Sequence, residues 1–557
     1  MSIAIGACPS DSMRGGLHNP TMLDAHEFQV PDLSGLSPEA AQAATLAVRK
    51  ILDLVNEQAL QISRKDQEIK FKDAKLQKLT FELARHKAWR FGAKTERMNA
   101  EQRQIFEDTL AEDQASLQAQ IEALKGKVAP GNTPPSDAPK RAPRRQALPD
   151  HLRRVVHHHE PESTTCPTPA CGQAMKRVGE DISERLDIVP AEFFVHRHIY
   201  GKWACRCCQL LVQEPAQPQI IDGGMPAAGL VAHTLVSRFV DHIPYYRQET
   251  INTRSGVHTP RSTLASWSGA GGAALDPLCE ALRSFVLSSA IVQADETPVA
   301  MLDPGAGKTK RAYIWGYARG AFDAMPAVVY DFCTGRGARF PVAFLGTWSG
   351  TLVRDEYKGY EQVTALHDRQ AAGCLAHARR KYDELLKDKG SPVAAEAVQR
   401  IAAIYRIERE LRGMRPHERL AQRQALAGPL WESLHAWLTL ETRRVPEGSA
   451  TAKAIHYSLN HWQALTANLR DGHVPLDNNH LENLMRPWAM GRKAWLFCGS
   501  ELAGQRAANV MSLVVSAKLN GHDPWAYLKD VLTRLPTHLN SRIEELLPHR
   551  WQPITIA

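Results

Sequence analysis

Three acidic residues in three separate segments have the chemistry to hold metal ions for phosphoryl transfer. Asp295 lies in IVQADETPVA, Asp355 in TLVRDEYKGY and Glu482 in LDNNHLENLMRPWAMGRKAWLF. Mg²⁺ takes oxygen ligands but keeps waters and substrate phosphate in its shell, so a few carboxylates can hold a pair of ions. We therefore expect Mg²⁺ or Mn²⁺ at these three residues, and an enzyme that cuts or joins nucleic acid strands.

Both aspartates also have a structural interpretation. Asp295 follows an apolar, strand-like run, and Pro298 should stop the strand from continuing normally. Asp355 ends the run GTLVR, and an aspartate at a strand end is more often a turn residue than a ligand. Glu296 and Glu356 lie beside them, but neighbouring residues of a strand face opposite sides.

Glu482 has a different alternative, because Asn479 and Glu482 are spaced like the two partners of a helix capping box. Cations in the same segment favour the catalytic interpretation, since they would hold a phosphate backbone over the metal site. These cations are Arg486, Arg492 and Lys493.

Two cysteine pairs flank a strand-like segment, EFFVHRHIYGKWA. Two such pairs around a hairpin are typical of a structural four-thiolate zinc site. In a reducing compartment this is favoured over a disulfide framework. Cys207 and the run His157 to His159 are alternative ligands. The predicted zinc ligands are Cys166, Cys171, Cys205 and Cys208.

The size and composition of the chain indicate a globular protein of three or four domains, with 557 residues and 43% hydrophobic residues. We find no run of about 18 apolar residues that would cross a bilayer, and no secretory signal at the N-terminus. We therefore expect no membrane partner and a cytoplasmic protein. The net charge of +8 is small for a chain of this length, but basic residues cluster in parts of it.

The N-terminal region, residues 38–125, should be helical and partly coiled coil. Apolar residues recur every seventh position at Val48, Val55, Ile62, Ile69, Leu76 and Leu83. The neighbouring row of heptad positions, which should complete the seam, has few apolar residues. This pattern predicts a helix that pairs protomers, with an ordinary amphipathic helix as the alternative. Within the region, AWRFGAKTERM breaks and restarts the helix, so Lys94 and Arg97 could belong to a DNA-reading turn.

Two further segments are candidates for DNA contact. Residues 126–155 form a Pro-rich, basic linker, in which Arg141, Arg144 and Arg145 would attract a polyanion, or simply be solvated. Residues 228–270 divide into three short helices of helix-turn-helix spacing, with Arg261 at the start of the last one. The alternative for the second segment is a helical connector packed on the core.

Residues 285–515 alternate strands and helices in an order typical of a ribonuclease H-like fold. Strand-like runs SAIVQAD, RAYIWGYAR and AVVYDFC precede GTLVRDE, and GCLAHARRKYDELLKD follows as strand and helix. Residues 392–447 look like an all-helical insertion. We thus expect a multidomain, α-rich protein with a ribonuclease H-like α/β core, preceded by the N-terminal helical region and a small zinc-binding β module at residues 156–215.

Several of these segments resemble transposases of the insertion-sequence-66 family. The resemblance is carried by DETP, DEYKGY, GCLAHARRKYDELL, DNNHLENLMRPWAMGRKAWLFCGS and DPWAYLKDVLTRLP, with the RFGAKTER segment and the cysteine pairs also similar. The first cysteine pair is more widely spaced than is usual in that family. The resemblance places the DDE triad on Asp295, Asp355 and Glu482, a Cys-x-x-His signature with a supporting His377, and a C-terminal element at residues 520–557.

The resemblance implies a prokaryotic DNA transposase of the TnpC type, which would be associated with the nucleoid when bound to DNA. It would bind the terminal inverted repeats of its element as double-stranded DNA, and cut and join strands by DDE two-metal chemistry. Companion proteins of the same element are possible partners. Two alternatives stay open: a non-catalytic DNA-binding repressor derived from a transposase, and a ribonuclease H-like nuclease without strand transfer.

Overall fold

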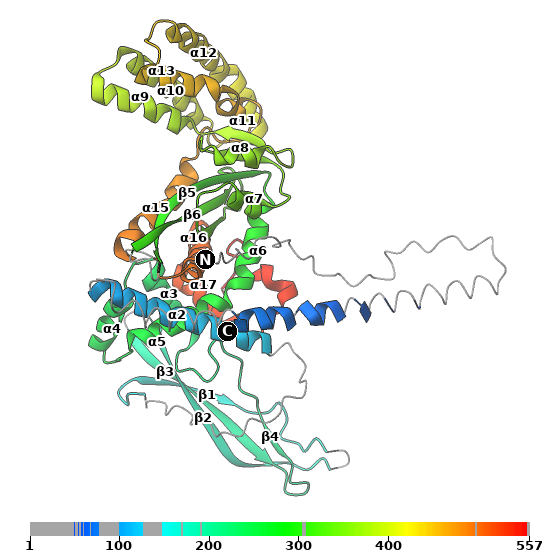
Figure 1. Ribbon diagram of the computed structural model, residues 1–557. Coiled ribbons are helices and arrows are strands. Elements are labelled where there is room, and N and C mark those ends of the chain that lie inside the picture. Colours follow the sequence, from blue (N-terminus) through cyan, green and yellow to red (C-terminus); the bar gives the residue numbers. More distant parts are fainter. Residues whose placement is uncertain are drawn as a thin grey trace, which may run out of the picture. The chain divides into compact units, whose positions relative to one another are not determined.

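A computed structural model describes residues 50, 54, 57–58, 61–66, 68–76, 100–125, 148–168, 171–189, 192–303, 308–495 and 498–553 (Figure 1). The chain divides into two units, residues 1–82 with 120–141, and residues 83–119 with 142–557. Both β-sheets and all three candidate catalytic acids belong to the second unit. No helix in the described ranges is both long and apolar enough to cross a bilayer.

The described part of the first unit contains helical residues 61–66 and 68–76. Its heptad residues Ile62, Ile69 and Leu76 are 54%, 55% and 60% exposed. Val48, Val55 and Leu83 lie outside the described residues. An apolar row that faces water at this spacing is what a self-associating helix presents before it pairs.

A four-stranded sheet holds the cysteine and histidine motifs. Its central strand β3 pairs in parallel with β1 and antiparallel with β2 and β4 (Figure 1). Leu186 and Ile188 of β2 and Val195 of β3 are buried against the following helices. The bounds are β1 (Arg153–His159), β2 (Lys176–Val189), β3 (Glu192–Ala204) and β4 (Leu211–Gln213).

Short helices connect this sheet to the next. The expected breaks occur at Pro244 and at Gly256, whose φ of +80° suits a residue without a side chain. The helices are α3 (Ala228–Phe239), α4 (Tyr245–Arg254), α5 (Arg261–Ala274) and α6 (Asp276–Leu287).

Helix α2 (Ala100–Lys125) packs on this region through buried charges. Arg506 donates to Glu112 Oε2 at 2.7 Å and to Asp113 Oδ1 at 2.9 Å, and all three residues are buried. A side chain at Gly269 of α5 would collide with the Glu112 carbonyl, so glycine allows the close approach of the two helices.

The central sheet has the strand order β7-β6-β5-β8-β9. β5, β6 and β7 are antiparallel, whereas β8 and β9 run parallel to β5. The bounds are β5 (Ile291–Asp303), β6 (Lys308–Arg319), β7 (Val328–Cys333), β8 (Thr351–Arg354) and β9 (Gln370–Gly373), with α7 (Arg339–Leu345) before β8 and α8 (Gly359–Thr364) after it.

Contrary to expectation, β5 continues through Pro298, which is paired with Tyr313 of β6. The reason is that β8 pairs only with Ile291 to Gln293. On that side, the described residues form no further ladder with β5 until Cys498, which bonds to the backbone of Ala300 and Leu302. Proline is tolerated at a position where no ladder bond is needed. Asp295 therefore lies within a strand and not at its end.

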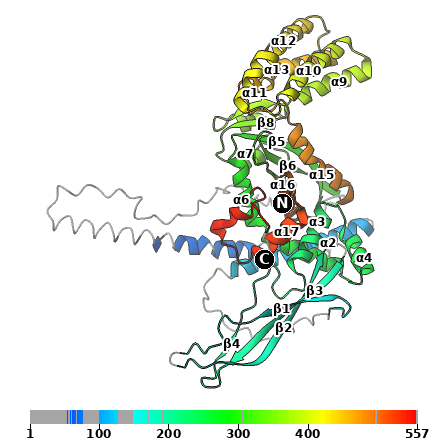
Figure 2. The same ribbon diagram turned by 180° about the vertical axis from the view of Figure 1, so that it is seen from behind.

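Helices of the C-terminal part cover the sheet and complete the main core. Figure 2 shows α15 beside β5 and β6, and Trp488 of α15 is buried with Trp315 of β6. At the outer strand β7, Ser512 and Ser516 of α16 accept hydrogen bonds from the N–H groups of Tyr330 and Val328. Side-chain hydroxyls thus satisfy an edge that would otherwise be open. The bounds are α15 (Asn479–Trp495), α16 (Glu501–Leu519), α17 (Pro524–Arg534) and η3 (Asn540–Leu546).

A helical layer with its own core lies between β9 and α15 in the chain. Tyr382, Ile401, Trp431 and Ile455 are buried in that core. The helices extend on both sides of the expected 392–447. They are α9 (Leu375–Lys389), α10 (Pro392–Glu410), α11 (Pro416–Gln422), η1 (Arg423–Ala427), α12 (Gly428–Thr442), α13 (Ala450–Asn460), α14 (Trp462–Leu465) and η2 (Ala467–Leu469).

Candidate active site

The parallel pairing of β5 and β8 brings Asp295 and Asp355 to the same level of the sheet. Gln293 pairs with Val353, and each aspartate comes two residues later (293 + 2 and 353 + 2). Side chains two residues apart on a strand share a face. Asp295 Oδ1 accepts from the N–H of Glu296 at 2.9 Å, and Asp355 Oδ1 accepts from the N–H of Tyr357 at 3.0 Å.

Glu482 reaches the same region through Asn478, a fully buried residue that the sequence reasoning missed. Asn478 Nδ2 donates to the Ala294 carbonyl at 2.9 Å, and its Oδ1 accepts from Gln293 Nε2 at 2.9 Å. Glu482 follows one helical turn later, with its N–H bonded to the Asn478 carbonyl. The pair Asn478-Asn479 at the start of α15 is the feature of the sequence that could have indicated this residue.

The alternative capping box at Asn479 and Glu482 is not formed. The Asn479 side chain donates to Asp477 Oδ2 at 2.8 Å. Glu482 Oε1 instead lies 3.6 Å from His377 Nδ1 and 3.9 Å from Cys374 Sγ. The glutamate therefore faces the core of the site and does not close its own helix end.

The electrostatics of the site favour a cation. Burial, together with the charges of Glu296, Asp355 and Glu482, raises the pKa of Asp295 to about 7. A carboxyl group whose ionised form is disfavoured by other carboxylates regains that free energy when a metal ion binds. The oxygen-only donor set and the crowding of negative charge fit Mg²⁺.

The glutamates next to the aspartates have other partners. Glu296 accepts from Arg336 Nε at 2.7 Å and from the Tyr360 hydroxyl at 2.9 Å. Glu356 pairs with Arg354 at 3.1 Å and with His461 at 2.8 Å. These ion pairs and hydrogen bonds engage both glutamates.

A cavity of about 550 Å³ opens over Asp355 and is rich in cations. Arg336 is held over the Tyr357 ring at 3.9 Å while it binds Glu296, and Arg380 Nη2 lies 3.8 Å from Glu482 Oε2. Neither arginine was singled out from the sequence. The charged residues that line the cavity are Arg336, Asp355, Glu356, Lys358, His377, Arg380, Lys381 and Glu384.

His377, expected as a supporting residue, lines this cavity at the start of α9, next to Cys374. Cys374 Sγ accepts from the N–H of Asn478 at 3.2 Å, so the cysteine also fixes the segment that leads to Glu482. Burial raises the pKa of the Cys374 thiol to about 12.

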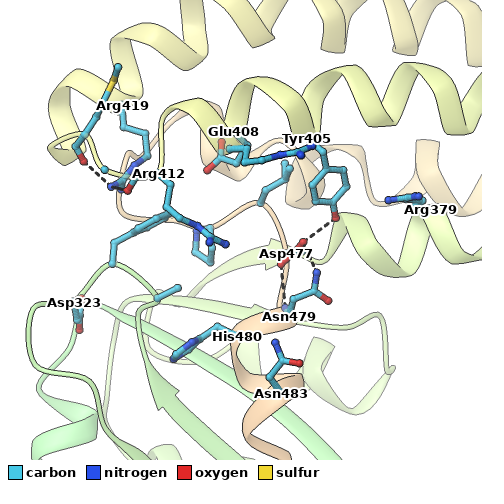
Figure 3. Close-up of a pocket in the computed structure, with 17 residues that line it drawn as sticks. Asp323, Arg379, Tyr405, Glu408, Arg412, Arg419, Asp477, Asn479, His480 and Asn483 are labelled. Atoms are coloured by element: carbon cyan, nitrogen blue, oxygen red, sulfur yellow. Dashed lines mark hydrogen bonds between the residues drawn. The ribbon is translucent and has the colours of Figure 1, made fainter. Parts of the chain in front are cut away.

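A second hollow, of about 950 Å³, is lined by residues at the start of α15 and by residues of the helical layer (Figure 3). Arg412 comes from the helical layer, whereas His480 and Asn483 belong to α15. The three acids of this groove are paired: Glu408 with Arg423, Asp323 with Arg319 at 3.2 Å, and Asp477 with the Tyr405 hydroxyl at 2.8 Å. In the described part of the chain, Arg409 and Arg412 have no such partner, and both are exposed.

The other residues expected to contact DNA are scattered. Arg261 lies 3.6 Å from Glu107 and 3.7 Å from Asp108 of α2, so acidic residues of the same chain face it. Arg486 is exposed on α15, and Arg492 and Lys493 are within that helix. The remaining ones, Lys94, Arg97, Arg141, Arg144 and Arg145, lie outside the described residues.

The four expected cysteines form one cluster, with their sulfur atoms within 4.8 Å of one another. Hydrogen bonding with Thr168 lowers the pKa of the Cys166 thiol to about 6, which suits a metal thiolate. Exposed Cys207 lies outside the cluster. Two of the alternative histidines contact other histidines, with His157 Nε2 2.8 Å from His196 Nδ1 and His159 Nε2 3.0 Å from His198 Nδ1, and His158 is exposed and outside the cluster. The cluster fits a structural zinc ion.

Four family models match the chain. The model described as Transposase IS66 family matches residues 223–506, and the IS66 C-terminal element matches 512–549. The zinc-finger binding domain of transposase IS66 matches 154–209, and the Transposase C of IS166 homeodomain matches 78–156.

Curated relatives come from Sinorhizobium fredii. Uncharacterized protein y4jD is 40% identical over 421 residues, which cover 73% of this chain and 81% of the relative. Uncharacterized protein y4qI is 36% identical over 439 residues, which cover 76% of this chain and 81% of the relative. These relatives share most of the length of the chain.

Proposed function

We propose a function for this chain, which belongs to the IS66 family of transposases. It cuts the ends of its DNA element and joins them to target DNA by two-metal chemistry. The observation that carries the proposal is that Asp355, directly after β8, and Glu482, on α15, are close enough to Asp295 of β5 for their charges to raise its pKa. Three carboxylates brought together from distant parts of a chain are suited to a metal pair.

We assign residues 285–515 to a ribonuclease H-like catalytic domain. Three antiparallel strands followed by two strands parallel to the first support this assignment. The helical layer between β9 and α15 would then be an insertion in that domain. The C-terminal element, at 520–557, packs on the same core through residues such as Tyr527 and Trp551.

In the proposed mechanism, Asp295, Asp355 and Glu482 hold the ions against the strand to be cut. When bound, Mg²⁺ activates water or a 3′-hydroxyl as the nucleophile and stabilises the leaving oxygen. Arg336 and Lys358 border Asp355 and would neutralise the scissile phosphate and its neighbours. The ion pair with Glu296 holds Arg336 in place before DNA arrives.

The protein would contact DNA at several places besides the metal site. The zinc module and the basic linker are assigned to the element ends, and the groove with Arg409 and Arg412 to a phosphate backbone close to the catalytic centre. The exposed heptad row Ile62, Ile69 and Leu76 supports pairing of protomers, which would bring two ends together.

The test is Mg²⁺-dependent cleavage and strand transfer on a DNA fragment that carries the element's own ends. Wild type, Glu482→Gln and Glu432→Gln would be compared, since Glu432 is an exposed glutamate of α12 outside both cavities. We expect only Glu482→Gln to lose both reactions while it still binds the ends. Cleavage without joining would indicate a nuclease, and binding without cleavage by wild type would indicate a repressor or a need for companion proteins.

A further inference from the structure

Three side chains of different chemistry meet at the edge of the active site. Cys374 Sγ and His377 Nδ1 lie 3.9 Å and 3.6 Å from the same Glu482 oxygen, Oε1. The three ligand atoms are all within 4.8 Å of one another. A thiol, an imidazole and a carboxylate thus converge on one point, although Cys374 and Glu482 are 108 residues apart.

These separations are close to those of a tetrahedral zinc site. Zinc binds sulfur at about 2.3 Å and nitrogen or oxygen at about 2.0–2.2 Å, so two ligand atoms of one tetrahedron lie about 3.3–3.7 Å apart. Small side-chain movements would bring the three atoms around one ion. Three protein ligands leave the fourth position free for water.

We propose that Cys374, His377 and Glu482 form a second zinc site, distinct from the four-cysteine module, that takes Glu482 away from the catalytic metals. The binding part of the proposal stands on the cluster alone. The inhibitory part rests on the proposed function, because it requires Glu482 to be a ligand of the catalytic ions.

The chemistry of the ligands selects the metal. A sulfur and a nitrogen ligand suit Zn²⁺ and other borderline or soft ions, whereas Mg²⁺ takes only oxygen. Cys374 would bind as the thiolate and release its proton to solvent, His377 would bind through Nδ1 as the neutral ring, and Glu482 is the carboxylate.

The two oxygens of Glu482 face different partners. Oε1 faces Cys374 and His377, whereas Oε2 lies 3.8 Å from Arg380 Nη2. The Arg380 side chain is 56% exposed, so it can move away from an incoming cation. Zinc on Oε1 would hold the carboxylate toward α9, and Asp295 and Asp355 would be left without their third partner.

The binding test uses the full-length protein and Zn²⁺ alone. Bound zinc would be counted after equilibrium dialysis in wild type, Cys374→Ser, His377→Gln and Cys333→Ser, with thermal unfolding as the check that each variant is folded. Cys333 is a buried cysteine outside both clusters and is the matched control. We expect two zinc ions per chain in wild type and Cys333→Ser, and one in the other two variants.

Loss of either ligand should weaken the second zinc ion by more than about 100-fold, since even removal of a residue that only supports a metal ligand costs about 10- to 100-fold. Asp355→Asn should keep two zinc ions, which separates this site from the acidic pair. One zinc ion in wild type, or two in both folded Cys374→Ser and His377→Gln, would overturn the proposal.

A second measurement addresses inhibition. With Mg²⁺ in excess, addition of Zn²⁺ equal to one further ion per chain should abolish end cleavage by wild type, and a chelator of moderate affinity should restore it. If two ions bind but cleavage persists, the site is not inhibitory. If wild type never cleaves, the proposed function fails, while the zinc count still decides the binding part.

Discussion

Asp295 on β5 and Asp355 directly after β8 each lie two residues beyond Gln293 and Val353, which pair in the parallel register of the two strands. Asp355 comes 60 positions after Asp295 (355 − 295), and the segment between them contains the rest of β5, the strands β6, β7 and β8, the helix α7 and the connections between them. The register of a single short parallel pairing therefore places both carboxylates at one level. The following predictions depend on that arrangement and on the elements that support it.

Asp295→Asn should stabilise the metal-free protein above neutral pH. The pKa of Asp295 rises from its usual 3.8 to about 7 in the folded protein, so between these values the folded state binds more protons than the unfolded state. Wild type therefore loses stability as pH rises through that window, and the asparagine variant does not. At pH 8 we expect a gain of about 1 to 3 kcal/mol in the free energy of unfolding.

The measurement is denaturant unfolding at pH 5 and pH 8 in Mg²⁺-free buffer with the zinc module loaded. Asp388→Asn, at an exposed position of α9, is the control and should show no such difference. An equal effect of Asp295→Asn at both pH values would contradict the electrostatic explanation.

Asn478→Ala should reduce cleavage although Asn478 bears no charge. The change leaves the Ala294 carbonyl and the Gln293 amide without their partner in a buried place, which costs about 1 to 3 kcal/mol. It also frees the start of α15, so Glu482 is less well placed. End cleavage and thermal unfolding would be measured beside Asn460→Ala, an exposed asparagine at the end of α13. Full cleavage by folded Asn478→Ala would argue against a positioning role.

The double change Arg409→Gln and Arg412→Gln should weaken DNA binding at every sequence. If both arginines contact phosphates, the plot of log affinity against log salt should lose about 2 units of slope. Arg443→Gln removes an exposed arginine of the same helical layer that lines neither cavity. An unchanged slope in the double variant, or an equal loss in Arg443→Gln, would exclude the groove of Figure 3 as a specific DNA contact.

Cys171→Ser should release zinc from the four-cysteine module, because it removes one of four thiolates. We expect the variant to bind one zinc ion fewer than wild type and to lose affinity for the element ends. Cys207→Ser, one residue before a predicted ligand but outside the cluster, should keep the metal. Zinc analysis and a gel shift with end DNA would decide; loss of zinc in Cys207→Ser instead would show that the ligands were assigned wrongly.

Arg506→Met should destabilise the second unit strongly. Glu112 and Asp113 of α2 would be left as buried charges without their cation, which costs about 3 to 5 kcal/mol. Denaturant unfolding measures the loss. Replacing all three charges, with Glu112→Gln and Asp113→Asn added, should recover much of it, and failure to recover would point to lost packing of the arginine stem instead.

The family and the four-cysteine cluster could be predicted from the sequence alone and are confirmed, whereas the catalytic role of the three carboxylates stays a prediction. These features depend on residue type and local spacing, so they can be recognised without knowledge of the fold. The three short helices at 228–270 were also predictable, because proline and glycine end helices through the local backbone. The expectation that Pro298 would interrupt its strand failed, because tolerance of proline depends on whether a second strand pairs there.

The groups that surround the carboxylates could not be predicted without the folded structure. Asn478 hydrogen-bonds the segment before α15 to β5, Arg336 forms an ion pair with Glu296, and Cys374 and His377 lie beside Glu482. These pairs join residues as far as 184 positions apart in the chain. Their contacts follow from strand register and helix packing, which are set by burial of the whole core and cannot be derived from any short segment.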